Sequence, residues 1–189
     1  MIIKLMEDSG LIQQLENIKN ASRVYRDGAA DFVLDNPEVM PELMQCVFRV
    51  DSPLHVKAAW VLELVCLQNI SLLYPHVPYF IKHLSSLKNE SALRPASKVC
   101  YFMNRAYFSS GKNAPDLSLS MIDLIIVNNF DWLLQDHKVA TQVFAMDTLN
   151  LWSDELPWVR EALVSILEKN VNSGSSGYRS HALKLLKNL

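Results

Sequence analysis

Four prolines recur at near-constant spacing in this chain of 189 residues, and this repeat limits the possible folds more than any other feature. A period of about 40 residues is typical of stacked helical hairpins. Proline suits the first turn of a helix, where its missing N–H would have no intrahelical partner, and it ends the helix before it. The repeat therefore predicts four helices, each beginning at one proline. The four tripeptides are Pro37-Glu38-Val39, Pro75-His76-Val77, Pro115-Asp116-Leu117 and Pro157-Trp158-Val159, with the prolines 38, 40 and 42 residues apart.

The residues after each proline divide into two helix faces. Counting the proline as zero, positions +2, +6 and +9 lie within about 60° of one another on a helix of 3.6 residues per turn. We expect these positions to be buried, because all twelve are hydrophobic: Val39, Leu43, Cys46, Val77, Ile81, Leu84, Leu117, Met121, Leu124, Val159, Leu163 and Ile166. Positions +1, +5 and +8 point the opposite way and are polar except for Phe80, Ala162 and Trp158. This second set is predicted to face outward.

A second helical segment precedes each proline, at residues 22–34, 55–70, 93–108 and 137–152. We expect each segment to form a hairpin with the proline-led helix that follows it. Segment 55–70 is apolar nearly all round, which is typical of a helix buried between neighbours. Residues 178–189 are predicted to cap the last hydrophobic layer, and the stretch from Leu11 to Ile18 to cover the other end.

The period, the paired helices and the two faces together resemble the HEAT and armadillo superfamily of α-solenoids, from about Ser9 to Leu189. The tripeptides Lys57-Ala58-Ala59 and Lys138-Val139-Ala140 align in two of the preceding segments. The resemblance implies an all-α fold: a right-handed α-α superhelix of about four repeats plus a C-terminal capping helix, forming one domain over residues 1–189. It also implies that the proline-led helices line the concave side, where a partner would bind.

Composition and cysteine content favour a cytoplasmic helical protein. Half of the residues are hydrophobic and only five are glycine, which disfavours disorder and an all-β fold. Residues 1–8 lack the pattern of a secretory leader, and no apolar run reaches the roughly 18 residues that span a bilayer. Cys46, Cys66 and Cys100 are widely spaced on expected helices, and we expect them to be reduced core residues.

Charge is distributed in blocks, although the net charge is only −2. Residues 54–113 hold seven basic and two acidic groups, whereas residues 114–156 hold one and seven. The blocks could form a striped surface that orients a partner, or they could reflect ordinary variation among solvated helix faces. Nucleic acid is disfavoured as a partner, since a duplex-binding face needs many Lys and Arg side chains.

No sequence motif predicts catalysis, a metal or a cofactor. His76 and His83 are seven residues apart on one helix face, about 10 Å along the axis, which is too far to share an ion. Neither a Cys-x-x-Cys pair nor a Gly-x-Ser-x-Gly elbow occurs. The stretch Gly174-Ser175-Ser176-Gly177 lacks the Lys-Thr or Lys-Ser ending of a phosphate loop. We therefore expect a protein that is not an enzyme.

The sequence favours a protein-interaction scaffold that binds a protein or peptide through the exposed face of the proline-led helices. Trp158 is a large aromatic residue at a position that holds Glu, His or Asp in the other copies, so it is a candidate interface hot spot. Alternatively, Trp158 folds back onto Trp152. The candidate partner-binding residues are Glu42, His76, Tyr79, His83, Asp123 and Trp158.

Two other functions fit the sequence less well than a scaffold. Some DNA glycosylases are built from HEAT-like repeats, but such an enzyme needs a basic concave face, which the net acidity disfavours. An adenylosuccinate lyase has a Ser-Ser-x-Met-Pro-x-Lys-x-Asn-Pro loop; Ser175-Ser176-Gly177-Tyr178 departs from it at once, and the chain is too short. The sequence identifies neither the partner nor the oligomeric state.

Overall fold

The computed structural model describes residues 10–109, 111 and 114–189, and within them every regular element is a helix. The all-α class is therefore confirmed. Ser9 and the first eight residues, where no leader is predicted, lie outside the described part. The α-helices are α1 (Leu11–Glu16), α2 (Arg23–Asp35), α3 (Met40–Phe48), α4 (His55–Gln68), α5 (Val77–His83), α6 (Glu90–Ser109), α7 (Leu119–Leu134), α8 (Val139–Trp152), α9 (Pro157–Asn170) and α10 (Ser176–Leu186). Short 3-10 helices are η1 (Pro37–Val39), η2 (Ile70–His76) and η3 (Leu84–Ser86).

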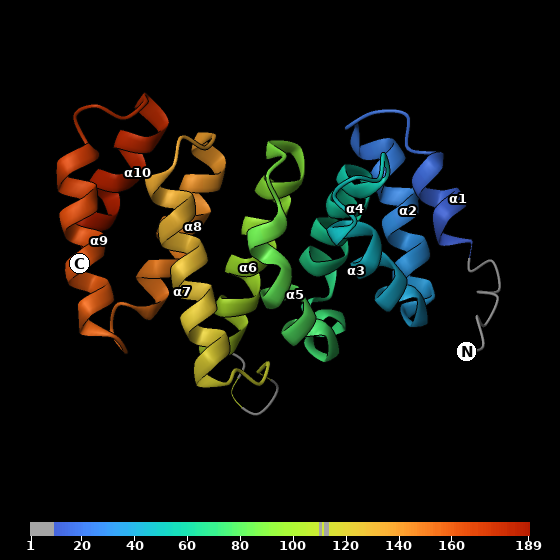
Figure 1. Cartoon of the computed structure of the whole chain (residues 1–189), viewed down its shortest axis with the longest axis horizontal. Coiled ribbons are helices and arrows are strands. Elements are labelled where there is room, and N and C mark those ends of the chain that lie inside the picture. The colour runs from blue at the N-terminus through green and yellow to red at the C-terminus, as the bar shows by residue number, and fades with distance from the viewer. Residues whose placement is uncertain (1–9, 110, 112–113) are drawn as a thin grey trace.

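The helices stand side by side in a row that follows the chain from α1 at one end to α9 and α10 at the other (Figure 1). Helices α2, α4, α6 and α8 each pack on the next even-numbered helix, up to α10, and we call these five helices the even layer. The odd layer consists of α3, α5, α7 and α9. Successive odd-layer helices contact each other closely only at α5 and α7.

The pairing of helices differs from the sequence-based expectation. Helix α3 packs most extensively on α4, and α7 on α8, so each of these proline-repeat helices pairs with the helix after it rather than the one before it. Helix α9 packs on both α8 and α10. The repeat period is the same in either assignment, and for this reason spacing alone could not decide where a hairpin begins.

Three of the four repeated prolines lie at or just before a helix start. Pro37 begins η1, which leads into α3, Pro157 is the first residue of α9, and Pro75 lies in η2 before α5. The prediction is wrong at Pro115, because α7 begins only at Leu119. The Ser118 hydroxyl accepts a hydrogen bond from the Met121 N–H at 3.4 Å, and a serine cap of this kind sets the helix start.

Burial largely follows the predicted faces. Nine of the twelve expected core positions are buried, Met121 and Ile166 are half-buried, and Leu124 is 43% exposed. The later start of α7 places Ile125 and Ile126 in the core instead of Leu124. Phe80 was expected on the outer face but is fully buried, with its ring 6.0 Å from the ring of Phe48. An aromatic side chain of that size gains more from this apolar contact than from exposure.

One cluster of buried apolar side chains runs through the described chain from Leu11 to Leu185. Leu11, Leu15 and Ile18 are buried at the first end, and Tyr178 and Ala182 at the last, in agreement with the expected caps. The three cysteines are free and buried, as predicted. Burial raises the pKa of the Cys66 thiol and raises that of Cys100 to about 12.

No single helix in the described residues is long and apolar enough to cross a membrane. The segments His55–Gln68 and Ile70–Ser86 reach that length and composition only as a pair, and they are bent by 118° relative to each other.

Candidate partner-binding site

An open hollow of about 640 Å³ lies where the end of α6, the start of α7 and the start of α9 meet. Its lining is mostly aromatic and aliphatic, with two carboxylates among the apolar groups. The lining includes Phe108, Leu119, Asp123, Trp152, Glu155 and Trp158. We call this feature the α7–α9 hollow.

Three aromatic rings form the floor of the hollow. Trp152 is buried, and its ring lies 5.4 Å from the ring of Tyr107 in a stacked arrangement. The ring of Phe108 meets Trp152 edge-on at 4.8 Å. Stacked and edge-on contacts of this kind hold aromatic rings in defined orientations.

A buried asparagine fixes the position of Trp152. The indole Nε1 of Trp152 donates a hydrogen bond to Oδ1 of Asn104 at 2.7 Å, and Asn104 is itself fully buried. The Nδ2 group of Asn104 donates in turn to the carbonyl of Cys100 at 2.8 Å, one turn earlier in α6. Because both groups of the amide are engaged, the floor is held in place before any partner arrives.

Trp158 stands on the rim of the hollow and is 54% exposed. Its ring lies 6.0 Å from the ring of Phe130 in α7. Trp158 therefore lies against Phe130 of α7, and it lines the same hollow as the buried Trp152. Half of a tryptophan surface remains available to a partner.

The exposed side of α7 continues the apolar rim. Leu119, Val127 and Leu134 are 81%, 56% and 60% exposed. Together with Phe130 they fall within about 80° of the helix circumference. Single exposed hydrophobic residues are common on protein surfaces, whereas a contiguous apolar strip beside a hollow is a feature of interaction surfaces.

The described lining of the hollow carries negative charge. Asp123 and Glu155 line it, and no Lys or Arg is among the described lining residues. Arg160 in α9 is occupied elsewhere, because it pairs with Asp154 and donates to the carbonyl of Leu189 at 3.2 Å. The hollow thus combines apolar walls with two carboxylates that a cation on a partner could approach.

The structure places the other sequence-predicted residues outside the hollow. Tyr79 and His83 stack on each other with ring centroids 4.1 Å apart, and Phe48 lies 5.8 Å and 5.6 Å from them. The His83 Nδ1 group donates to the Tyr79 carbonyl at 2.8 Å, so the pair is held within α5. His76 is half-buried, and its burial lowers the pKa of the imidazole. Glu42 is half-buried in the first turn of α3.

Of the six predicted residues, therefore, the structure brings only Asp123 and Trp158 into one hollow. Sequence reasoning missed Phe108, Glu155 and the exposed leucines of α7. The signal that could have found the leucines is the composition of residues 119–134, which are apolar on nearly every side. Such a segment in an outer layer must leave apolar side chains exposed.

The described residues contain no group of three or more His, Cys, Asp or Glu side chains that could hold a metal ion. What the hollow can do is hold an apolar side chain against a fixed aromatic floor. No family model, no curated protein and no solved structure matches the chain.

Proposed function

We propose that this chain is a non-catalytic protein-interaction scaffold that binds a partner protein through the α7–α9 hollow. The single observation that carries the proposal is the exposure of Trp158 at 54%, on an apolar rim above a preformed aromatic floor. Interface hot spots are enriched in tryptophan and lie beside well-packed pockets. A floor that is already ordered also reduces the entropy cost of binding.

The occupant of the hollow is a partner segment that presents an aliphatic or aromatic side chain with a lysine or arginine close to it. The apolar group fills the space between Phe108, Trp152 and Trp158. The cation lies near Asp123 and Glu155, which line the same space. Charged groups at such a rim contribute mainly to specificity and to the rate of association.

The proposed architecture is a short right-handed α-solenoid of the HEAT and armadillo kind. The recurring proline period and the row of helices in Figure 1 support it. Helices on the inside of an arc lie closer together than those on the outside. Because the even-layer helices pack on one another more extensively than the odd-layer helices do, we assign the concave side to the even layer, and not to the proline-led helices as the family resemblance implied. Three unpaired cysteines suit the reducing cytoplasm, where we place the protein.

A peptide-display selection tests the proposed function without knowledge of the natural partner. We expect selection of 12-residue peptides on the wild type to enrich a hydrophobic residue next to Lys or Arg. The Trp158→Ala variant should bind the enriched peptides about thirtyfold more weakly, corresponding to about 2 kcal/mol.

The matched control is Leu183→Ala, which also shortens an exposed apolar side chain but lies on α10. It should retain wild-type affinity. Absence of any enriched peptide, or equal binding by wild type and Trp158→Ala, would contradict the proposal.

A further inference from the structure

Helix α6 carries a stripe of cations and aromatic rings that are not among the lining residues of the hollow. Arg94, Lys98, Tyr101, Phe102 and Arg105 fall within about 100° of the helix circumference. The only acidic residue of the helix is Glu90, at its first position. The stripe holds three of the seven basic groups in residues 54–113.

Neighbouring even-layer helices extend the stripe. Lys98 Nζ lies 5.5 Å from the ring centroid of Phe102 and 5.9 Å from that of Phe144 in α8. The Arg105 guanidinium lies 5.9 Å from both Tyr101 and Phe102. On α2, the Arg26 guanidinium lies 5.8 Å from Trp60 of α4. We call these eight residues the basic–aromatic face: Arg26, Trp60, Arg94, Lys98, Tyr101, Phe102, Arg105 and Phe144.

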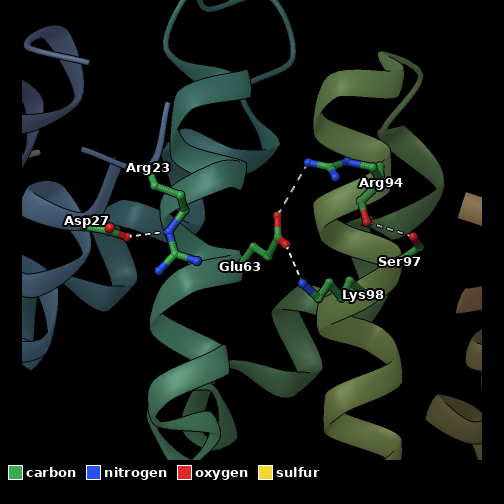
Figure 2. A network of polar contacts seen from close by, with 6 residues as sticks. All are labelled: Arg23, Asp27, Glu63, Arg94, Ser97 and Lys98. Atoms are coloured by element: carbon green, nitrogen blue, oxygen red, sulfur yellow. Dashed lines mark hydrogen bonds and ion pairs between the residues drawn. The ribbon is translucent and has the colours of Figure 1, made fainter. Parts of the chain in front are cut away.

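The cations of this face exceed the carboxylates that pair with them. Glu63 in α4 reaches across to α6, where it lies 2.8 Å from Lys98 Nζ and 3.8 Å from Arg94 (Figure 2). Its Oε2 atom is buried and has no hydrogen bond. Within the described residues no carboxylate pairs with Arg26 or Arg105, and Nε of Arg26 is buried without an acceptor. Glu63 therefore serves two of the four cations of this face, and the other two have no carboxylate partner among the described residues.

We propose that the basic–aromatic face binds an extended acidic segment of a protein partner. Carboxylates of the segment pair with Arg94 and Arg105, which are eleven residues and about 16 Å apart along the helix. An extended chain covers that distance in about five residues. The aromatic rings between the two arginines cover apolar side chains of the segment. This second surface does not depend on the α7–α9 hollow.

Charge complementarity favours an acidic polypeptide over a nucleic acid. Four cations are too few for a duplex-binding face, which neutralises many phosphates. Glu63 lies among the cations, and it would repel a phosphate placed between Arg94 and Lys98. A peptide can avoid this conflict by spacing its carboxylates, whereas a nucleic acid carries a phosphate at every nucleotide.

Fluorescence anisotropy with a labelled peptide of Asp-Phe-Glu-Ser repeated three times tests the proposal. The wild type should bind this peptide and should not bind the same peptide with Lys in place of Asp and Glu. The double variant Arg94→Glu with Arg105→Glu should bind at least about tenfold more weakly, because two attractive contacts become repulsive. Glu63→Gln should tighten binding, since it frees Lys98 and Arg94 from their internal carboxylate.

The matched control is Lys82→Glu with Lys169→Glu, which makes the same charge change on exposed odd-layer positions. It should leave the affinity unchanged. If the double arginine variant fails to fold, Arg105→Gln replaces it, because Arg105 has no carboxylate partner on which folding could depend. The proposal would be overturned if the wild type did not bind the peptide, or if the control variant lost as much affinity as the double arginine variant. It would also be overturned if a single-stranded oligonucleotide bound more tightly and displaced the peptide.

Discussion

At the scale of single residues, Asn104 is the side chain on which the floor of the hollow depends. Replacing it by alanine leaves the indole N–H of Trp152 without an acceptor in a buried position. Such a loss costs about 1 to 3 kcal/mol. We therefore expect Asn104→Ala to lower the free energy of unfolding by about 2 kcal/mol, as measured by urea denaturation.

The control for this change is Asn188→Ala. Asn188 also donates to a carbonyl four residues earlier, at 3.1 Å, but it is exposed. Water can replace its hydrogen bond, and we expect a change of less than about 0.5 kcal/mol. Equal destabilisation by the two substitutions would show that burial of the Trp152 contact has no special role.

Two tryptophans show which features of the hollow could be predicted from the sequence and which could not. Trp158 was identified because a large aromatic residue replaces charged or polar residues at the same repeat position, and the structure does place it on an exposed rim. The Asn104–Trp152 bond could not be identified, because it joins residues 48 apart in the chain. Long-range pairs of this kind depend on the packing of whole helices, which a local pattern does not contain.

At the scale of helices, a proline inside α6 explains a bond between α4 and α6. Pro95 has no N–H, so it cannot donate to the carbonyl of Ser91 four residues earlier. The indole Nε1 of Trp60 in α4 donates to that carbonyl instead, at 2.9 Å. The Ser91 carbonyl, which lacks a donor within α6, therefore accepts a hydrogen bond from the neighbouring helix α4.

A double-mutant cycle tests this link. In the wild type, Trp60→Phe should lose a bond worth about 0.5 to 1.5 kcal/mol beyond any packing loss. In a Pro95→Ala background, where the helix can make its own bond to Ser91, that extra loss should disappear. The measurement is the coupling free energy from four denaturation curves. A coupling of zero would mean that the Trp60 bond does not depend on the missing N–H of Pro95.

Helix positions were predictable where a proline and the helix start coincide, as at Pro37 and Pro157. At Pro115 the cap at Ser118 delays the helix, and counting from the proline then places Leu124 wrongly in the core. The pairing of hairpins was also wrong, because a period of about 40 residues does not define where a repeat begins. Phe80 shows that a single aromatic side chain can be buried even when most residues at the equivalent helix positions are polar.

At the scale of the whole molecule, two surfaces differ in the charge of their described residues. The α7–α9 hollow contains Asp123 and Glu155, whereas the basic–aromatic face centres on α6 and includes Arg94 and Arg105. We infer that one partner with a basic apolar segment and another with an acidic segment could bind at once. The scaffold function that we propose would use both surfaces of one stack of helices.

The most direct test of the central claim is an NMR titration that follows the four tryptophan indole N–H signals while a display-selected peptide is added. Each tryptophan reports on a different place: Trp158 on the rim, Trp152 on the floor, Trp132 in the core and Trp60 on the basic–aromatic face. We predict that the Trp158 and Trp152 signals shift while those of Trp132 and Trp60 stay in place. Unchanged Trp158 and Trp152 signals, in a titration where the peptide still binds, would contradict the account.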